Sequence, residues 1–171
     1  MPDLDLRTAV PADAGALHAL IASHALEGHL LPRELEEIRR HAERFVVCDV
    51  AGEIKACAEL APLSSRLSEV RSLVVSDDFR RVGLAARLVG ELRRRATAAG
   101  FEMLCAFTHD ARLFVRQEFS IVPHLWLPEK IQTDCTGCPL FRKCDQYAMV
   151  MTLREVPRFA APAAVRRFSA A

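Results

Sequence analysis

The centre of the chain reads Ser72-Leu73-Val74-Val75-Ser76-Asp77-Asp78-Phe79-Arg80-Arg81-Val82-Gly83-Leu84-Ala85. An apolar run predicts a strand over residues 69–75, and apolar residues at helical spacing predict a long helix over residues 84–99. The turn between them carries an Arg-x-x-Gly-x-Ala segment. A strand, a turn and a helix in this order form the central unit of an α/β domain.

This turn has the chemistry of an anion site. The first turn of a helix has free backbone N–H groups and the positive end of the helix dipole, which together favour a phosphate. Gly83 and Ala85 keep bulky side chains away, and Arg80 and Arg81 add positive charge. No Gly-Lys-Ser/Thr follows as in a Walker A loop, and the first glycine of a dinucleotide fingerprint is missing.

The remaining elements complete an α/β pattern. Further strands are predicted over residues 4–10, 45–49, 54–60, 101–107, 119–123 and 148–153, and further helices over residues 14–26, 32–43 and 111–117. The two strands at 45–60 form a hairpin. We therefore predict a mixed central sheet flanked by helices in a single domain over residues 1–153, including an irregular cysteine-rich loop at 128–147, and then a basic, Pro- and Ala-rich tail at 154–171.

Composition limits the function classes. The 171 residues include 23 basic and 22 acidic side chains, so no net field draws the protein to nucleic acid or to an anionic membrane. No apolar run approaches the roughly 18 residues of a spanning helix, and the N-terminus lacks the features of a signal peptide. We expect a cytoplasmic protein.

The turn resembles the coenzyme A loop of the GNAT acetyltransferases. The opening Leu6-Arg7-Thr8-Ala9, the hairpin before the loop and Thr108 at the end of a later strand extend this resemblance over residues 4–153. It implies the GNAT fold, whose sheet splays beside the central strand to admit the acetyl group, and acetyl-CoA as co-substrate. The implied contacts are the pyrophosphate on Arg80, Arg81, Val82, Gly83, Leu84 and Ala85, and the pantetheine arm and the oxyanion on the backbone of Leu73, Val74 and Val75.

Acetyl transfer to an amine needs an unprotonated amine, an oxyanion donor and a proton for the leaving thiolate. Glu69 has a position similar to that of the glutamate base in the histone acetyltransferase branch, so it is the first candidate base, with Glu59 in reserve. Glu69 could instead be an edge carboxylate paired with Arg71 or Arg66. Where many family members have a tyrosine acid, this chain has Phe114. The acid is then solvent or the ammonium of the intermediate.

The segment Leu127 to Met149 is similar to the short stand-alone bacterial N-acetylglutamate synthases, which read Leu-Pro-x-Lys, Asp-Cys-x-x-Cys-Pro, Cys-Asp and Ala-Met in this region. That resemblance implies an amino-acid acceptor, first L-glutamate, with N-acetyl-L-glutamate as product in the first step of arginine biosynthesis, and a homodimer. A guanidinium holds a carboxylate bidentately. Arg71 is therefore the first candidate for binding the acceptor and Lys130 the second, although either could be a surface charge.

Two other functions fit the same sequence. One is a GNAT enzyme for another amine, such as a peptide N-terminus, a polyamine or an aminoglycoside; the absence of an acidic cluster near the acceptor side argues for an anionic substrate instead. The other is a binding module for CoA or a metal, without turnover.

The six cysteines fall into two groups. Cys48, Cys57 and Cys105 lie in apolar strands and are predicted to be buried. The group Cys135, Cys138 and Cys144 falls short of four zinc ligands and lacks a neighbouring histidine, so we predict no metal. Asp145, His124 or a cysteine of a second subunit would have to complete such a site, or an iron–sulfur cluster would have to form. We favour packing of these thiols in a loop over the acceptor site.

Overall fold

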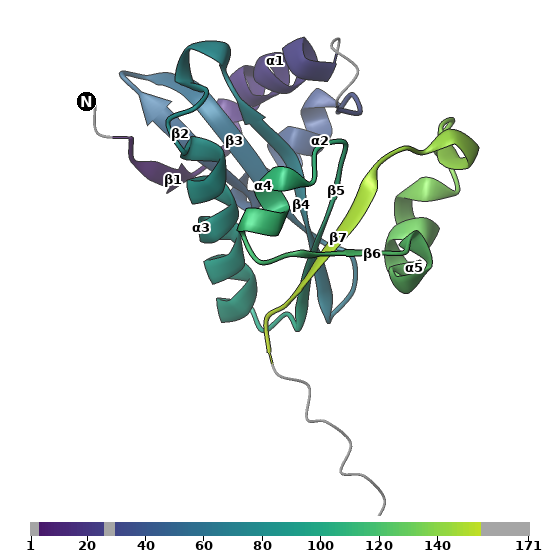
Figure 1. Cartoon of the computed structure of the whole chain (residues 1–171). Helices are drawn as coiled ribbons and strands as arrows, with labels where there is room; N and C mark the ends of the chain where they lie inside the picture. Colours follow the sequence, from purple (N-terminus) through teal and green to yellow (C-terminus); the bar gives the residue numbers. More distant parts are fainter. Residues whose placement is uncertain (1–3, 26–29, 155–171) are drawn as a thin grey trace, which may run out of the picture.

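The computed structural model describes residues 4–25 and 30–154. Within these residues seven strands form one sheet in the order β1-β2-β3-β4-β5-β7-β6 (Figure 1). The strands are β1 (Leu6–Thr8), β2 (Phe45–Val50), β3 (Glu53–Pro62), β4 (Leu67–Val75), β5 (Met103–Thr108), β6 (Ser120–Val122) and β7 (Tyr147–Thr152). β4 and β5 run parallel, and the other described pairs are antiparallel. The predicted mixed sheet is confirmed.

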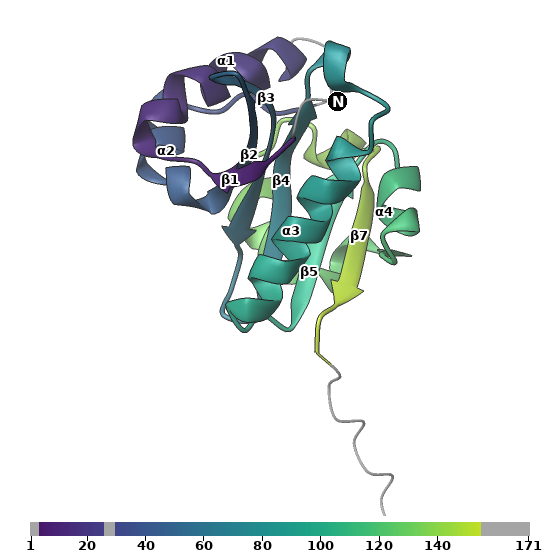
Figure 2. The same cartoon turned by 90° about the vertical axis from the view of Figure 1, so that its left-hand side faces the viewer.

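Helices cover both faces of this sheet (Figure 2). They are α1 (Ala14–Ala25), α2 (Leu35–Arg40), α3 (Leu84–Ala98), α4 (Arg112–Arg116) and α5 (Pro128–Lys130). Side chains alternate across a strand, so neighbouring residues of β2 join different cores. Val46 and Cys48 pack with α3, whereas Phe45 and Val47 pack with α1 and α2.

The predicted hairpin is confirmed, and its turn explains its geometry. Ala51 and Gly52 join β2 to β3 with φ of 53° and 86°. Positive φ at both central residues gives a turn whose twist matches that of the flanking strands.

The sheet splays beside the central strand. β4 and β5 pair from Leu67–Met103 to Val70–Ala106, although β4 continues to Val75. On its other side β4 changes register with β3 between Cys57 and Glu59, near Ser72, whose φ is 47°. A bulge bends a strand and raises its twist. β4 therefore runs on from Val70 to Val75 without pairing with β5, as the resemblance to the GNAT fold implies.

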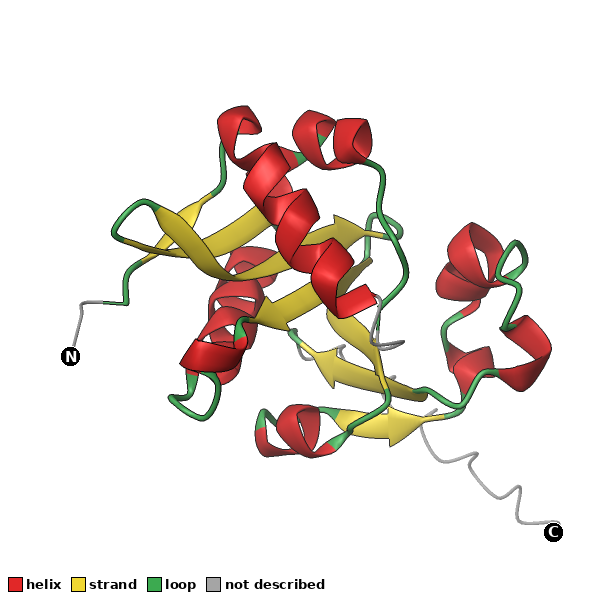
Figure 3. Cartoon of the chain, turned by 90° about the horizontal axis from the view of Figure 1, so that it is seen from above, coloured by secondary structure: helices red, strands yellow, loops and turns green. Residues whose placement is uncertain are grey.

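Residues 128–146 form a separate lobe on the side of β6 and β7 (Figures 1 and 3). It contains α5, a π-helical turn at Ile131–Cys135 and a 3-10 turn at Phe141–Lys143. The prediction of an irregular segment at 128–147 was wrong here. Turn residues such as Pro128 and Gly137 hid the helical turns, which are too short to produce a periodic pattern.

Several predicted boundaries also need correction. The helix expected at 32–43 is confined to Leu35–Arg40, with Glu34 as its N-cap, and a 3-10 turn follows at Ala42–Arg44. The strand expected at 4–10 is confined to Leu6–Thr8, and the one expected at 69–75 begins at Leu67. The end of the first predicted helix at residue 26 and residues 155–171 of the predicted tail lie outside the described residues.

The core beneath α3 should dominate stability. Leu88 is fully buried, whereas Leu125 is 81% exposed. Leu88→Ala should lower the free energy of unfolding by about 2–5 kcal/mol, since it leaves a cavity. Leu125→Ala should change it by less than about 0.5 kcal/mol. Urea unfolding followed by circular dichroism measures both, and equal losses would contradict this packing.

Candidate active site

A cleft of about 360 Å³ opens between the end of β4, the start of α3 and α4. Six of the predicted CoA-loop residues line it, namely Val75, Arg80, Arg81, Gly83, Leu84 and Ala85. Phe79, Ala86, Leu113, Arg116 and Gln117 complete the lining. Of the other predicted residues, Val74 is buried in the core beneath α1 and Val82 is exposed. Leu73 packs at the margin of the α3 core.

The entrance to α3 suits an anion. Gly83 immediately precedes the helix with φ of 80°, a left-handed conformation that favours glycine. Gly83, Leu84 and Ala85 line the cleft, so the first turn of this 15-residue helix, with its free N–H groups, borders it without a bulky side chain. Arg81 and Arg116 line the same cleft. Arg80 also lines it and donates to Asp77, with Nη2 and Oδ1 2.8 Å apart.

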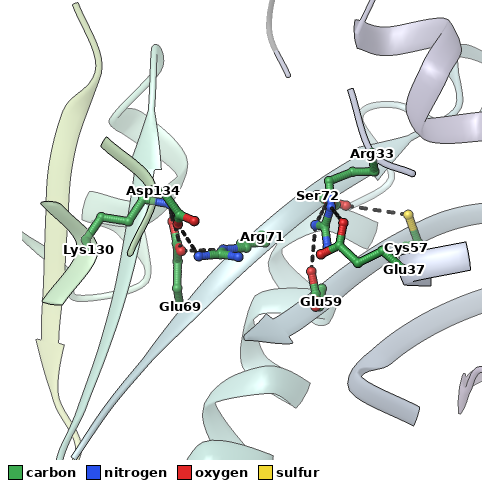
Figure 4. A network of polar contacts seen from close by, with 9 residues as sticks. All are labelled: Arg33, Glu37, Cys57, Glu59, Glu69, Arg71, Ser72, Lys130 and Asp134. Carbon is green, nitrogen blue, oxygen red and sulfur yellow. Dashed lines mark hydrogen bonds and ion pairs between the residues drawn. The ribbon is translucent and has the colours of Figure 1, made fainter. Parts of the chain in front are cut away.

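A second feature is a cluster of two carboxylates and two cations beside the splay (Figure 4). Lys130 Nζ lies 2.7 Å from Glu69 Oε1 and 2.8 Å from Asp134 Oδ2. Arg71 Nε donates to Glu69 Oε2 at 2.5 Å, and Arg71 Nη2 donates to Asp134 Oδ2. The structure thus brings together the predicted base Glu69 and the predicted acceptor-binding residues Arg71 and Lys130. Arg66, the other partner considered for Glu69, pairs with Glu102 instead.

The chain builds this cluster from two distant elements. Glu69 and Arg71 are two residues apart on β4, and strand alternation places them on one face. Pro128 begins α5, which brings Lys130 over the ring of Phe107, 5.3 Å from its centroid. Asp134 follows on the π-helical turn. Single π-turns are frequent at functional sites.

Electrostatics hold Arg71 in its charged form. Burial opposes the charge of Arg71, but attraction to Glu69, a hydrogen bond to Glu69 and attraction to Asp134 outweigh it, so the pKa of the guanidinium is raised. Burial, with the nearby charge of Glu69, raises the pKa of the Cys105 thiol well above its usual range. A thiol of raised pKa is a poor nucleophile. Cys105 is therefore not a candidate for covalent catalysis.

A separate network holds Glu59, the reserve base (Figure 4). Arg33 Nη1 lies 2.7 Å from Glu59 Oε2 and 3.1 Å from Ser72 Oγ, and Arg33 Nη2 lies 2.8 Å from Glu37 Oε1. Glu59 is almost completely buried. Neither Arg33 nor the pairing of Asp134 with the predicted cations was predicted from the sequence. The spacing of Arg33 and Glu37 signals an i,i+4 pair, but the pairing with Glu59 exists only in the tertiary structure.

The pair of Arg33 and Glu59 should be needed for stability. Their side chains are 11% and 1% exposed, whereas that of Glu37 is 42% exposed. Arg33→Ala should lower the free energy of unfolding by about 3–5 kcal/mol, because it leaves a buried carboxylate unpaired. Glu37→Ala, which removes the exposed partner of the same arginine, should cost less than about 1 kcal/mol. Chemical denaturation of both variants tests this difference, and a larger loss for Glu37→Ala would refute it.

No tyrosine is among the residues that line the cleft. Phe114, at the position of the tyrosine acid in many family members, is buried and packs edge-on against Phe119, with ring centroids 5.2 Å apart. Tyr147 is exposed at the start of β7. Its phenol is not among the groups that line the cleft.

The two groups of cysteines differ as predicted. Cys48, Cys57 and Cys105 are buried, which confirms their assignment to the core, and burial raises the pKa of Cys57 to about 12. Cys135, Cys138 and Cys144 are free and at least partly accessible in the lobe. Within the described residues no group of three or more His, Cys, Asp or Glu side chains is arranged to hold a metal ion.

Alkylation should separate these two groups. With iodoacetamide at pH 8, native protein should be labelled only at Cys135, Cys138 and Cys144, because the other thiols are buried and protonated. Six labels should appear in urea. Peptide mass spectrometry identifies the sites, and rapid labelling of Cys57 in native protein would show that the core opens readily.

Residues 16–119 match the model of the Acetyltransferase (GNAT) family. An uncharacterised N-acetyltransferase of Chlorobaculum tepidum is 34% identical over 155 residues, which cover 90% of this chain and 100% of the relative. The chain belongs to the GNAT acetyltransferase family. The predicted family and fold are thereby confirmed, and the chain is an N-acetyltransferase by family.

Other relatives match this chain over only part of their length. The amino-acid acetyltransferase of Ectopseudomonas mendocina is 35% identical over 104 residues, or 60% of this GNAT chain. The chain spans about a quarter, 24%, of the length of that relative.

No helix in the described parts of the chain is long and apolar enough to cross a membrane.

Solved structures share the fold. The N-acetylglutamate synthase of Neisseria gonorrhoeae, complexed with coenzyme A and N-acetyl-glutamate, superposes with a TM-score of 0.78 at 22% identity, covering 90% of this chain and 36% of that one. A Mycobacterium tuberculosis protein in complex with CoA gives a TM-score of 0.72 at 21% identity, covering 86% and 98%. These neighbours hold CoA, in agreement with the predicted co-substrate.

Proposed function

We propose that this GNAT chain transfers the acetyl group of acetyl-CoA to the α-amino group of an amino acid, with L-glutamate preferred. The observation that carries the proposal is the pair of cations Arg71 and Lys130 around the buried carboxylate of Glu69, beside the splay of β4 and β5. An amino-acid acceptor brings both an ammonium and a carboxylate, and this cluster offers a partner of opposite charge for each.

The cleft fits the co-substrate. CoA carries phosphates, and the cleft offers the start of α3, the left-handed Gly83 and several arginines. We assign the pyrophosphate to residues 80–85 and the pantetheine arm to the backbone of residues 73–75, which no longer pairs with β5. An extended arm there gains the backbone hydrogen bonds that a free strand edge offers. The acetyl group then enters the splay, toward the cluster.

Arg71 and Lys130 would bind the acceptor through its carboxylates. A guanidinium offers two parallel N–H donors to a carboxylate, and an ammonium offers a compact point charge. Both side chains are largely buried, so their charges are screened less than those on the surface. A dicarboxylic acceptor such as glutamate satisfies this pair better than a polyamine or an aminoglycoside, whose charges are positive.

Glu69 is assigned as the general base. A free amino acid is mostly ammonium near neutral pH, and attack on the thioester requires the neutral amine. The carboxylate of Glu69 first attracts the ammonium and then accepts its proton directly or through a water molecule. The nitrogen attacks the carbonyl carbon, backbone N–H groups of residues 73–75 stabilise the oxyanion, and the thiolate leaves with a proton from solvent or from the ammonium of the intermediate. Glu59 is held by Arg33 and takes no role in this scheme.

The relatives support this substrate class. Several proteins named amino-acid acetyltransferase align with 60% of the chain. We further propose that N-acetyl-L-glutamate is the product, that it enters arginine biosynthesis, and that the protein acts as a cytoplasmic homodimer.

The substrate assignment should be tested by CoA release over a panel of the twenty amino acids, an N-terminal peptide, spermidine and kanamycin. The protein's own cysteines must first be blocked, since released CoA is detected by its thiol. We expect glutamate to react fastest. Glu69→Gln should lower kcat about 100- to 10,000-fold, as expected for loss of a general base. Arg71→Ala should raise the KM for glutamate about 10- to 100-fold, because a charge-assisted hydrogen bond is lost.

Controls separate a failed substrate from a failed site. Arg112→Ala removes an exposed arginine that pairs with Asp110, and it should leave activity unchanged. Each variant must unfold at a midpoint close to wild type for its kinetics to count. Turnover confined to another amine would overturn the substrate. CoA binding by calorimetry without turnover on any amine would instead identify a binding module.

A further inference from the structure

The carboxylate of Asp134 occupies the cations that the proposed function assigns to the acceptor. Its Oδ2 atom accepts from Lys130 Nζ at 2.8 Å and from Arg71 Nη2. A single carboxylate oxygen of the lobe thus contacts both of them. An acceptor carboxylate must bind the same N–H groups, so the two carboxylates compete for one position.

The charge of the cluster explains why Asp134 and an acceptor carboxylate cannot bind the two cations together. Glu69 and Asp134 contribute two negative charges, and Arg71 and Lys130 contribute two positive ones, so the cluster is neutral. A third carboxylate would leave a net negative charge in a largely buried site. Burying a charge without a partner is costly, because its hydration is lost and nothing compensates. Binding of an anionic group therefore requires one of the two resident carboxylates to leave.

The structure distinguishes the carboxylate that can leave. The side chain of Glu69 is 3% exposed and lies on a strand paired on both sides, with Ala61 of β3 and Cys105 of β5. The side chain of Asp134 is 30% exposed and lies on a π-helical turn of the lobe. In Figure 4 the carboxylate of Asp134 lies between Lys130 and Arg71. Asp134 can return to water by a change in one short turn, whereas Glu69 cannot.

We propose that Asp134 is a displaceable internal ligand that stands in for the acceptor carboxylate, and that it determines which acceptors enter. This inference rests on the proposed function for its account of the acceptor. An acceptor with a suitably placed carboxylate replaces Asp134 on Arg71 and Lys130 and keeps the cluster neutral. An amine without a carboxylate cannot replace Asp134, so the ion pairs of Asp134 with Arg71 and Lys130 stay formed. In the empty protein the same contacts keep the two buried cations paired.

The test uses glutarate, a dicarboxylate without an amine, so that binding is measured apart from turnover. Titration calorimetry at fixed ionic strength compares the wild type with Asp134→Asn, which keeps the shape of the side chain and removes its charge. The variant should bind glutarate about tenfold more tightly, because a competing charge-assisted interaction is gone. The KM for glutamate should fall by a similar factor, while the KM for acetyl-CoA stays unchanged.

Two controls accompany this comparison. Asp145→Asn removes a carboxylate from the same lobe that is 80% exposed and pairs with His109, and it should not change glutarate affinity. The neutral diamide glutaramide should bind both proteins equally weakly. If Asp134→Asn unfolds early in thermal denaturation, Asp134→Ser repeats the comparison with a smaller polar side chain.

The outcomes separate this inference from the proposed function. Unchanged or weaker glutarate binding in both Asp134 variants would overturn the inference, since Asp134 would then only position the cations, and glutamate turnover by the wild type would leave the function intact. Tighter glutarate binding together with a wild type that does not acetylate glutamate would uphold the displacement and refute the substrate.

Discussion

The structure depends on a carboxylate that is buried where a sheet opens. Glu69 lies on β4 just before the last residue that pairs with β5, and it is almost completely inaccessible. A carboxylate in such a place must have cationic partners, because its desolvation is otherwise uncompensated. Arg71 meets this need from the same strand, and Lys130 meets it from a lobe some sixty residues later in the chain.

That requirement ties the lobe to the sheet. The lobe is joined to the rest of the chain through β6 and β7, at the end of the sheet farthest from β1. Its polar contacts with β4 run through Lys130 and Asp134, while Leu127 fills a small core with Leu67 and Cys105. The proposed acceptor site is therefore this ionic cluster, and the proposed coenzyme site is the turn before α3.

A second ionic network keeps the bulged part of β4 in place. Arg33 joins the segment before α2 to Glu59 of β3 and to Ser72, the residue with positive φ at the bulge. Bulges re-aim side chains at functional sites. Here a buried ion pair stands beside the bulge, so its shape rests on a tertiary contact and not on local sequence alone.

The sequence alone determined three features: the order of strands and helices along the chain, the Gly83 turn, and the common face of Glu69 and Arg71. They follow from the hydrophobic period, turn chemistry and strand alternation, which are local properties. Only the tertiary structure decided that Arg33 holds Glu59, that the lobe has helical turns, and that Asp134 lies on the two cations proposed for the acceptor. Those contacts join residues far apart in the chain. They follow from the need to pair buried charges, and no local pattern states which distant residue meets that need.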